Sequence, residues 1–196
     1  MKIKAIIFDL DGTLTEPMLD FSRIREEIGL DANSGDILSE IKAMDSDQCR
    51  RAHTILERHE QYAAQHSQLN DGVPELLTEL RRRRLPVGLL TRNTRKNTML
   101  VARRHQLFFD AVFDRDDGPV KPDSYGVLKL CKQFGALPAE TLVVGDFLHD
   151  LLSARSAGAI AVLLKTHPHA EKFEGHADYR ISHISELITI IEKLEQ

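Results

Sequence analysis

Short apolar segments alternate with amphipathic segments along most of this chain of 196 residues. Runs that are apolar at nearly every position are typical of parallel strands buried on both faces. They predict strands at residues 3–8, 86–90, 111–113, 141–144, 160–164 and, as a short edge strand, 179–181. Strands that alternate with helices form βαβ units with right-handed crossovers. We therefore expect an α/β fold, a Rossmann-like parallel sheet with helices on both faces and strand 3–8 at its centre.

Between the strands, apolar residues at helical spacing and local capping residues predict helices. Short polar side chains are preferred before the first turn of a helix, and glycine after its last turn. Asp71 is the expected cap of a helix that starts near Val73, and Asn93 or Thr94 the cap of residues 95–105. Asp123 is expected before residues 124–134, which end near Gly135, and Gly158 is expected to end residues 148–157. Ser182 or Ser185 is expected before the last helix.

The segment 16–70 interrupts this alternation, because its apolar residues recur at helical spacing and it contains no convincing strand. Residues 31–35 indicate a break between its helices. A helical segment of this size is marginally stable alone, so we expect it to pack over the sheet that it interrupts. The predicted organisation is a Rossmann-like core formed by residues 1–15 and 71–196, with an all-helical cap at residues 16–70 inserted after the first strand.

The composition narrows the class of protein. The formal net charge of −4 gives no general basic field for nucleic acid. Cys49 and Cys131 lie far apart without the spacing of a zinc site or disulfide framework, which favours a reducing compartment. No signal peptide is evident at the start, and no run approaches the ~18 apolar residues of a membrane span. We expect a soluble cytoplasmic protein with neither nucleic-acid nor membrane partners; its oligomeric state is left open.

Two acidic residues follow the first predicted strand at positions 9 and 11. Asp9 and Asp11 should leave the carboxyl end of that strand together, where open α/β sheets bind their ligands. Two carboxylates this close repel each other unless a cation neutralises them, and a hard divalent cation is the usual partner. One carboxylate can then act as a nucleophile while the other transfers protons.

Other predicted strand ends also carry polar residues. Thr91 ends one strand and enters a helix, so its hydroxyl and the nearby backbone N–H groups can face an anion. Lys121 precedes Pro122 at another helix start, and its ammonium group can reach a phosphate or a carboxylate. Asp146 follows a further apolar strand, with Asp150 four residues later. Together these motifs predict an acidic metal site beside a hydroxyl, a lysine and helix N-termini.

In this order, the four motifs resemble those of the haloacid dehalogenase-like hydrolase superfamily. The helical segment between the first and second motifs resembles the branch with a small helical cap, and the pattern is most similar to phosphoglycolate-phosphatase-like members. The resemblance covers essentially the whole chain. It implies a magnesium-dependent phosphatase, a phosphoric monoester hydrolase that acts on a small phosphorylated metabolite.

The resemblance also implies roles for the acidic residues. Asp9 is similar to the nucleophile that accepts the phosphoryl group as an aspartyl-phosphate. Asp11 is similar to the general acid and base, and its backbone carbonyl usually contacts the magnesium ion. Asp146 resembles a magnesium ligand, and Asp150 a ligand or the partner of a ligand. The expected metal site therefore comprises Asp9, Asp11, Asp146 and Asp150, with Mg²⁺ as the cofactor.

The phosphate side of the site is expected at Thr91, Arg92, Asn93 and Lys121. Thr91 resembles the hydroxyl that holds the transferring phosphate, and Lys121 resembles the lysine that orients the nucleophile and neutralises phosphate charge. Many relatives have asparagine directly after the hydroxyl, whereas this chain has Arg92, with Asn93 one residue later. Arg92 could contact the phosphate or point to solvent.

Alternative functions stay open at this point. A dehalogenase needs no acid at position 11 to protonate a halide, whereas an alkoxide leaving group does, so Asp11 favours a phosphate ester over a haloacid. A phosphomutase of the β-phosphoglucomutase kind would use the same motifs and return the phosphate to a bound sugar. A binding protein that retained the fold and lost turnover is the third possibility.

Two apolar or charged runs lie outside these motifs. Residues 81–84 are four consecutive arginines, which we interpret as the solvated last turn of a helix, where the helix dipole favours cations. Phe108 and Phe109 are predicted to belong to the hydrophobic core.

Overall fold

A computed structural model describes residues 2–32 and 34–196 and confirms the α/β fold class. Its strands form one sheet in the order β3-β2-β1-β4-β5-β6, with every neighbouring pair parallel and β1 in the interior. The strand bounds are β1 (Ala5–Phe8), β2 (Val87–Leu90), β3 (Ala111–Phe113), β4 (Thr141–Gly145), β5 (Ile160–Leu164) and β6 (Tyr179–Ile181).

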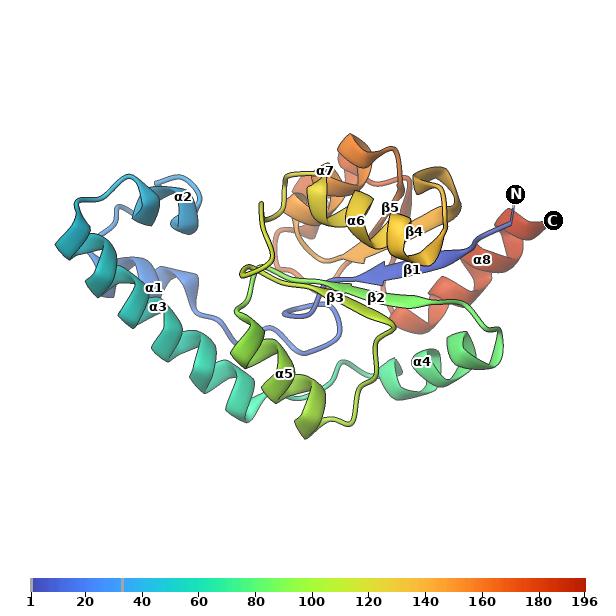
Figure 1. Cartoon of the computed structure of the whole chain (residues 1–196), viewed down its shortest axis with the longest axis horizontal. Coiled ribbons are helices and arrows are strands. Elements are labelled where there is room, and N and C mark those ends of the chain that lie inside the picture. Colours follow the sequence, from blue (N-terminus) through green and yellow to red (C-terminus); the bar gives the residue numbers. More distant parts are fainter. Residues whose placement is uncertain (1, 33) are drawn as a thin grey trace. The chain divides into compact units, whose positions relative to one another are not determined.

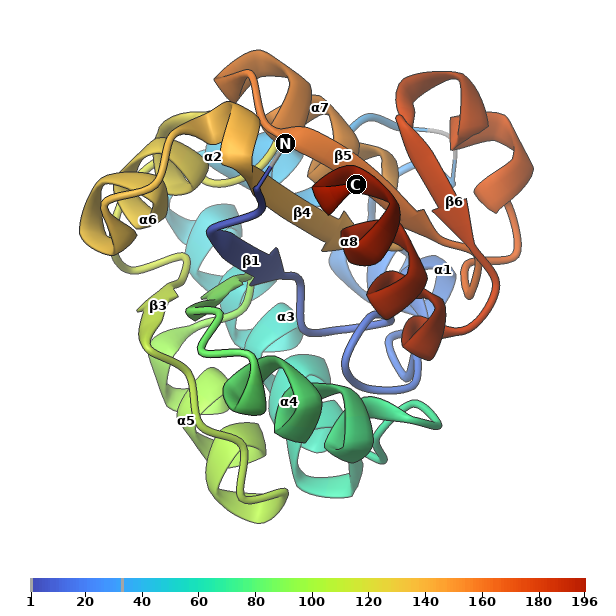
Figure 2. The same ribbon diagram turned by 90° about the vertical axis from the view of Figure 1, so that its right-hand side faces the viewer.

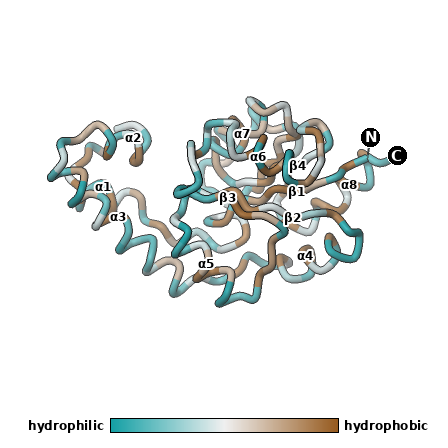
Figure 3. Tube along the Cα trace, viewed as in Figure 1, coloured by the Kyte–Doolittle hydropathy of each residue, from teal (hydrophilic) through white to brown (hydrophobic). Residues whose placement is uncertain are grey.

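Helices connect these strands and cover both faces of the sheet. Helices α6 and α7 lie on one face, and α4, α5 and α8 lie on the other (Figures 1 and 2). Hydrophobic residues follow the central strands (Figure 3), and every residue of β1, β2 and β4 is buried. The helix bounds are α4 (Val73–Arg82), α5 (Arg95–Arg104), α6 (Tyr125–Phe134), α7 (Leu148–Ala157) and α8 (Leu187–Glu195).

The chain divides into two compact units, Met1–Pro17 with Gln68–Gln196, and Met18–Ser67. The second unit contains α1 (Phe21–Ile28), α2 (Ile37–Lys42) and α3 (Ser46–His66), which share a core that includes Ile24, Ile41 and Leu56. The expected break at residues 31–35 lies between α1 and α2, although Asn33 is outside the described residues. None of the helices described combines the length and hydrophobicity needed to cross a bilayer.

Several predicted helix boundaries need correction. Gly72, with φ of 83°, is the N-cap of α4, and Asp71 provides no side-chain cap there. A short 3₁₀ segment, Ile184–Glu186, precedes α8 and is capped by His183 instead of Ser182 or Ser185. Thr94 does cap α5, because its Oγ1 accepts a hydrogen bond from the backbone N–H of Asn97. Local propensity cannot distinguish between neighbouring polar residues that could all act as caps.

The prediction that Phe108 belongs to the core is wrong. Phe108 is 69% exposed, and Phe109 is only partly buried. Both residues lie in the segment that connects α5 to β3, where Leu107 supplies the buried contact instead. An apolar pair on such a connection does not reveal which of its members faces the core.

Gly126 allows α6 to pack directly against the sheet. A methyl group on Gly126 would lie 2.5 Å from Leu90 Cδ1 and 3.0 Å from Phe113 Cδ1. Both neighbours are buried, so neither has free space into which it could move. The close approach of this helix to β2 and β3 therefore requires glycine at position 126.

We expect Gly126→Ala to lower the free energy of unfolding by about 1 kcal/mol or more. Overpacking in a core costs about 1–3 kcal/mol, whereas alanine gains at most ~1 kcal/mol over glycine in a helix. Urea unfolding measures the difference, with Gln133→Ala on the exposed face of the same helix as the control. An unchanged or increased stability of Gly126→Ala would contradict this packing.

Candidate active site

The sheet brings the predicted site residues to its carboxyl edge. Asp9 directly follows β1, Thr91 follows β2, and Asp146 follows β4. Because β1 lies between β2 and β4, these residues meet at neighbouring strand ends. Lys121 reaches the same edge from the segment between β3 and α6.

Lys121 lies at the centre of this group and is 3% exposed. Its Nζ atom donates hydrogen bonds to Asp9 Oδ1 at 2.5 Å, to Asp150 Oδ1 at 2.6 Å and to the backbone carbonyl of Leu90 at 2.8 Å. These partners use all three donors of the ammonium group. Burial opposes the charge, but the carboxylates of Asp150 and Asp9 outweigh it and raise the pKa of Lys121.

Asp9, Asp146 and Asp150 form a cluster of carboxylates. One oxygen from each lies within 4.8 Å of the others, and this is the single group of its kind in the part of the chain that the structure describes. Burial, together with the charges of Asp150 and Asp11, raises the pKa of Asp9 to about 7 although Lys121 opposes the shift. Burial and the neighbouring Asp9 and Asp150 likewise raise the pKa of Asp146 well above its ordinary value.

This cluster fits a divalent cation. Its donors are all carboxylate oxygens, the ligand type that Mg²⁺ prefers. Three carboxylates meet a single ammonium group here, so Lys121 alone does not balance their negative charge when all three are ionised. Asp150 Oδ2 accepts a hydrogen bond from the backbone N–H of Phe147 at 3.1 Å, which fixes its carboxylate within the cluster.

The Asp11 side chain lies outside that carboxylate cluster. Its Oδ2 accepts a hydrogen bond from Asn93 Nδ2 at 3.1 Å, and burial raises the pKa of its carboxyl group. A raised pKa makes the protonated form more available near neutral pH. A metal contact from the Asp11 backbone carbonyl stays a prediction.

The turn after β2 is fixed by its own side chains. Thr91 Oγ1 accepts a hydrogen bond from the backbone N–H of Asn93 at 3.0 Å, and Thr91 is 2% exposed. Asn93 Oδ1 in turn accepts from the backbone N–H of Thr94 at 2.9 Å. The bond to Asn93 uses a lone pair of Thr91 Oγ1, so the hydroxyl proton can still be donated.

Arg92 contacts His149 through its guanidinium group, Nη1 against Nδ1. His149 lies one residue before Asp150, on α7. This contact joins the turn after β2, which contains Arg92, to the start of α7. A contact between Arg92 and phosphate stays a prediction.

Further residues at the site are Gly12 and Thr13, which directly follow the two aspartates in the sequence, and Asn70, which carried no motif signal. Thr13 Oγ1 donates to Asp146 Oδ1 at 3.1 Å, and a side chain on Gly12 would meet Asp146 Oδ2 at 2.5 Å. Asn70 Nδ2 donates to three carbonyls of the loop after β1, those of Gly12, Thr13 and Thr15, at 2.8–3.1 Å. Asn70 is distant from that loop in sequence, so only the fold reveals its role.

Comparisons with known proteins agree with these motifs. A family profile described as haloacid dehalogenase-like hydrolase matches residues 3–158. An uncharacterised hydrolase of Saccharomyces cerevisiae is 30% identical over 203 residues, which covers 99% of this chain and 93% of the yeast protein. An N-acetylmuramic acid 6-phosphate phosphatase of Pseudomonas aeruginosa is 28% identical over 218 residues, and this alignment covers 98% of this chain and 96% of the Pseudomonas protein.

The fold comparison points the same way. The crystal structure of a hydrolase from Pseudomonas syringae superposes with a TM-score of 0.83 over 97% of this chain and 98% of the other, at 21% identity. At this identity the superposition supports a shared fold only. The family-profile match and the yeast relative are matches between sequences, and they support membership of a family. The chain therefore belongs to the haloacid dehalogenase-like hydrolase family, as its motifs indicate.

Proposed function

We propose that this protein is a magnesium-dependent phosphatase that hydrolyses the phosphate ester of a small metabolite through an aspartyl-phosphate on Asp9. The observation that carries the proposal is the meeting of the buried Lys121 ammonium group with the carboxylates of Asp9 and Asp150, beside Asp146. Crowding these charges together is costly for the fold, which favours a functional role.

The names of relatives support the reaction class. One similar protein is named N-acetylmuramic acid 6-phosphate phosphatase, and others are named phosphoglycolate phosphatase and pyrophosphatase. These names describe different phosphorylated substrates, so they support phosphate hydrolysis more strongly than any one substrate. We propose the coarse class, a small phosphorylated metabolite, for this chain.

In the first step, an oxygen of the ionised Asp9 carboxylate attacks phosphorus. The bond from phosphorus to the ester oxygen breaks, and its electron pair stays on the departing oxygen. Asp11 donates its proton to that oxygen, which leaves as an alcohol. Burial raises the pKa of Asp11 and so favours its protonated form, whereas the hydrogen bond from Lys121, and Mg²⁺ when bound, would favour the ionised form of Asp9 against the effect of its own burial.

In the second step, Asp11 accepts a proton from a water molecule as the water oxygen attacks phosphorus. The bond between phosphorus and Asp9 breaks, which releases inorganic phosphate and restores the Asp9 carboxylate. Asp11 therefore acts first as an acid and then as a base. Its hydrogen bond from Asn93 fits a carboxylate held in one orientation for both steps.

Lys121 and Thr91 would neutralise the negative charge of the phosphate and hold it in position for attack. The Lys121 ammonium group orients Asp9 through a 2.5 Å hydrogen bond and reduces the repulsion between Asp9 and an anionic phosphate. The Thr91 hydroxyl and the N-terminal N–H groups of α5 would bind phosphate oxygens. Asp9, Asp146 and Asp150, with the Asp11 carbonyl, would hold Mg²⁺, which supplies further neutralisation of negative charge when bound.

We further propose that the helical segment 16–70 is the cap that selects the substrate. Closure of such a segment excludes water from the reacting groups. We also propose a reducing compartment for this reaction, since Cys49 and Cys131 are both free thiols.

We expect magnesium-dependent release of inorganic phosphate from at least one compound in a panel of sugar phosphates, phosphorylated carboxylic acids and pyrophosphate. A colorimetric phosphate assay detects it and also distinguishes a phosphatase from a phosphomutase, which retains the phosphate on its product. Asp9→Asn should abolish release, because an amide is a poor nucleophile. Asp71→Asn is the control, since the Asp71 side chain is 98% exposed.

The same assay can contradict the proposal in two ways. Full activity of a correctly folded Asp9→Asn variant would exclude Asp9 as the nucleophile. Absence of phosphate release across the whole panel, with Mg²⁺ present, would instead support a binding protein that retains the fold.

We expect Mg²⁺ to raise the melting temperature of the protein, because an ion that binds the folded state stabilises it. Asp146→Asn should reduce this Mg²⁺-dependent shift by more than half, since it removes one charged ligand. Thermal unfolding with EDTA or Mg²⁺ measures the shift without requiring a substrate. An equal shift in both proteins would mean that the ion binds elsewhere.

A further inference from the structure

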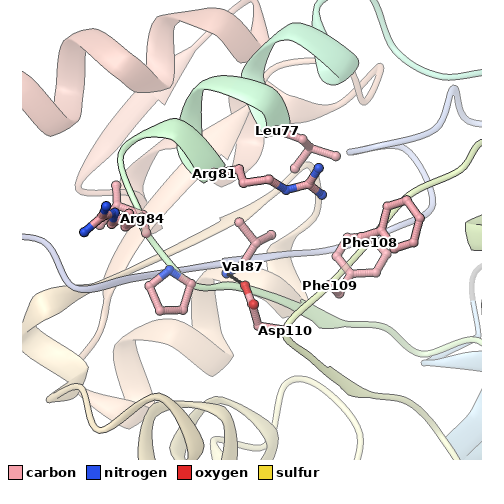
Figure 4. Close-up of a pocket in the computed structure, with 9 residues that line it drawn as sticks. Leu77, Arg81, Arg84, Val87, Phe108, Phe109 and Asp110 are labelled. Carbon is pink, nitrogen blue, oxygen red and sulfur yellow. Dashed lines mark hydrogen bonds between the residues drawn. The ribbon is translucent and has the colours of Figure 1, made fainter.

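Two parts of the molecule hold polar side chains that the proposed reaction does not use. One is the pocket of about 510 Å³ in Figure 4, where Arg81 and Arg84 lie on opposite sides and do not converge on one ligand group. The other is the first turn of α5, in which Asn97 and Thr98 are buried. Hydrogen bonds connect this turn to the proposed acid and base, Asp11.

Asn97 is a buried asparagine that is 2% exposed. Its Nδ2 donates a hydrogen bond to Asn93 Oδ1 at 3.1 Å. Its own Oδ1 is buried and accepts no hydrogen bond from residues 2–32 and 34–196. A buried acceptor without a protein partner costs stability, and asparagine is less favourable than alanine inside a helix. The stability of α5 therefore does not explain asparagine at position 97.

Capping of α5 does not explain Asn97 either. The N-cap is Thr94, whose Oγ1 accepts a hydrogen bond from the backbone N–H of Asn97. A polar residue three positions after the N-cap can accept a hydrogen bond from the N-cap backbone N–H, as in a capping box. Here the Thr94 N–H donates to Asn93 Oδ1 at 2.9 Å instead. The Asn97 side chain therefore contacts Asn93 without closing the helix end.

The two hydrogen bonds to Asn93 Oδ1 determine which way the Asn93 amide faces. The backbone N–H of Thr94 can only donate, so the atom that it contacts must be the amide oxygen. Asn97 Nδ2 is the second donor to this oxygen. Asn93 Nδ2 then faces Asp11 Oδ2, to which it donates at 3.1 Å. The contact from Asn97 thus helps to fix the hydrogen-bond donor that Asp11 receives.

The backbone of Asn93 is also held in place. Its N–H donates to Thr91 Oγ1 at 3.0 Å, and its carbonyl accepts from the backbone N–H of Arg115 at 3.0 Å. With the backbone held, the remaining freedom of Asn93 is rotation of its side chain, and the contact from Asn97 limits it. This precision matters for proton transfer, because a displacement of about 1 Å can cost ~100-fold in rate.

We propose that Asn97 is a positioning residue that orients the Asp11 carboxyl group through Asn93. Asn97 holds the Asn93 amide, and Asn93 holds Asp11 where its proton can reach the oxygen of the leaving alcohol. The role belongs to the step in which Asp11 protonates that oxygen, so it rests on the proposed function.

The leaving group of the substrate distinguishes this role from a general structural one. An alkyl phosphate needs protonation by Asp11, whereas 4-nitrophenyl phosphate releases a stabilised phenoxide and needs little. The alkyl substrate is the more reactive of benzyl phosphate and the best sugar phosphate of the panel. We expect Asn97→Ala to lower kcat/KM about tenfold or more for the alkyl phosphate, and less than about threefold for 4-nitrophenyl phosphate. This ratio is the one to measure, because it includes the step in which the alcohol leaves.

Thr98→Val is the matched control from the same helix turn. Thr98 is fully buried, and its Oγ1 has no hydrogen-bond partner in the described part of the chain. Valine has nearly the same shape and lacks only that hydroxyl, so kcat/KM for both substrates should match the unmodified protein. The melting temperature of Asn97→Ala should stay within about 3 °C of the unmodified protein. Loss of one hydrogen bond is offset there by removal of an unpaired oxygen and by the helix propensity of alanine.

A double-mutant cycle tests whether Asn97 acts through Asn93. Asn93→Ala alone should lower kcat/KM for the alkyl phosphate at least as much as Asn97→Ala does. Adding Asn97→Ala to Asn93→Ala should change this kcat/KM less than about twofold, because the amide that Asn97 orients is already absent.

Three results would overturn the proposal in an enzyme that is otherwise active. Equal losses for both substrates in Asn97→Ala would indicate a general effect on the fold, and unchanged kcat/KM would show that Asp11 does not depend on Asn97. Additive losses in the double variant would exclude a route through Asn93. In these cases the proposed function stands. An unmodified protein that releases phosphate from no compound would instead overturn the proposed function, and this inference with it.

Discussion

The position of the Lys121 ammonium group among buried carboxylates is the interaction on which the site depends. Asp9, Asp146 and Asp150 would repel one another strongly in a region of low dielectric constant, and Lys121 contacts two of them. Removing one partner of such a buried pair typically costs about 3–5 kcal/mol, because it leaves an uncompensated charge. The catalytic proposal and the local stability of the fold therefore rest on the same contacts.

Backbone geometry makes this crowding possible. Gly145 ends β4, and a side chain there would lie 2.2 Å from Asp150 Cβ, so glycine allows the start of α7 to turn towards the sheet. Gly12, with φ of 92°, similarly leaves room for the Asp146 carboxylate. The positions of the acids thus follow from strand ends together with two residues that lack side chains.

The sequence predicted the strands well, because strands buried on both faces must be apolar along their length. Strand ends then located Asp9, Thr91 and Asp146, since parallel strands place their carboxyl ends at one edge. It could not predict that Asn70 would bind the loop after β1, because that contact joins segments separated by an entire helical insert. Nor could apolar character alone show that Phe108 is exposed.

The covalent intermediate on Asp9 is the central claim, and it can be trapped directly. An acid quench during turnover, followed by borohydride reduction, converts an aspartyl-phosphate to homoserine, which mass spectrometry of peptides locates. We predict homoserine at position 9 only in samples that contained both substrate and Mg²⁺. Turnover that yields homoserine at another acidic residue, or at none, would contradict nucleophilic attack by Asp9.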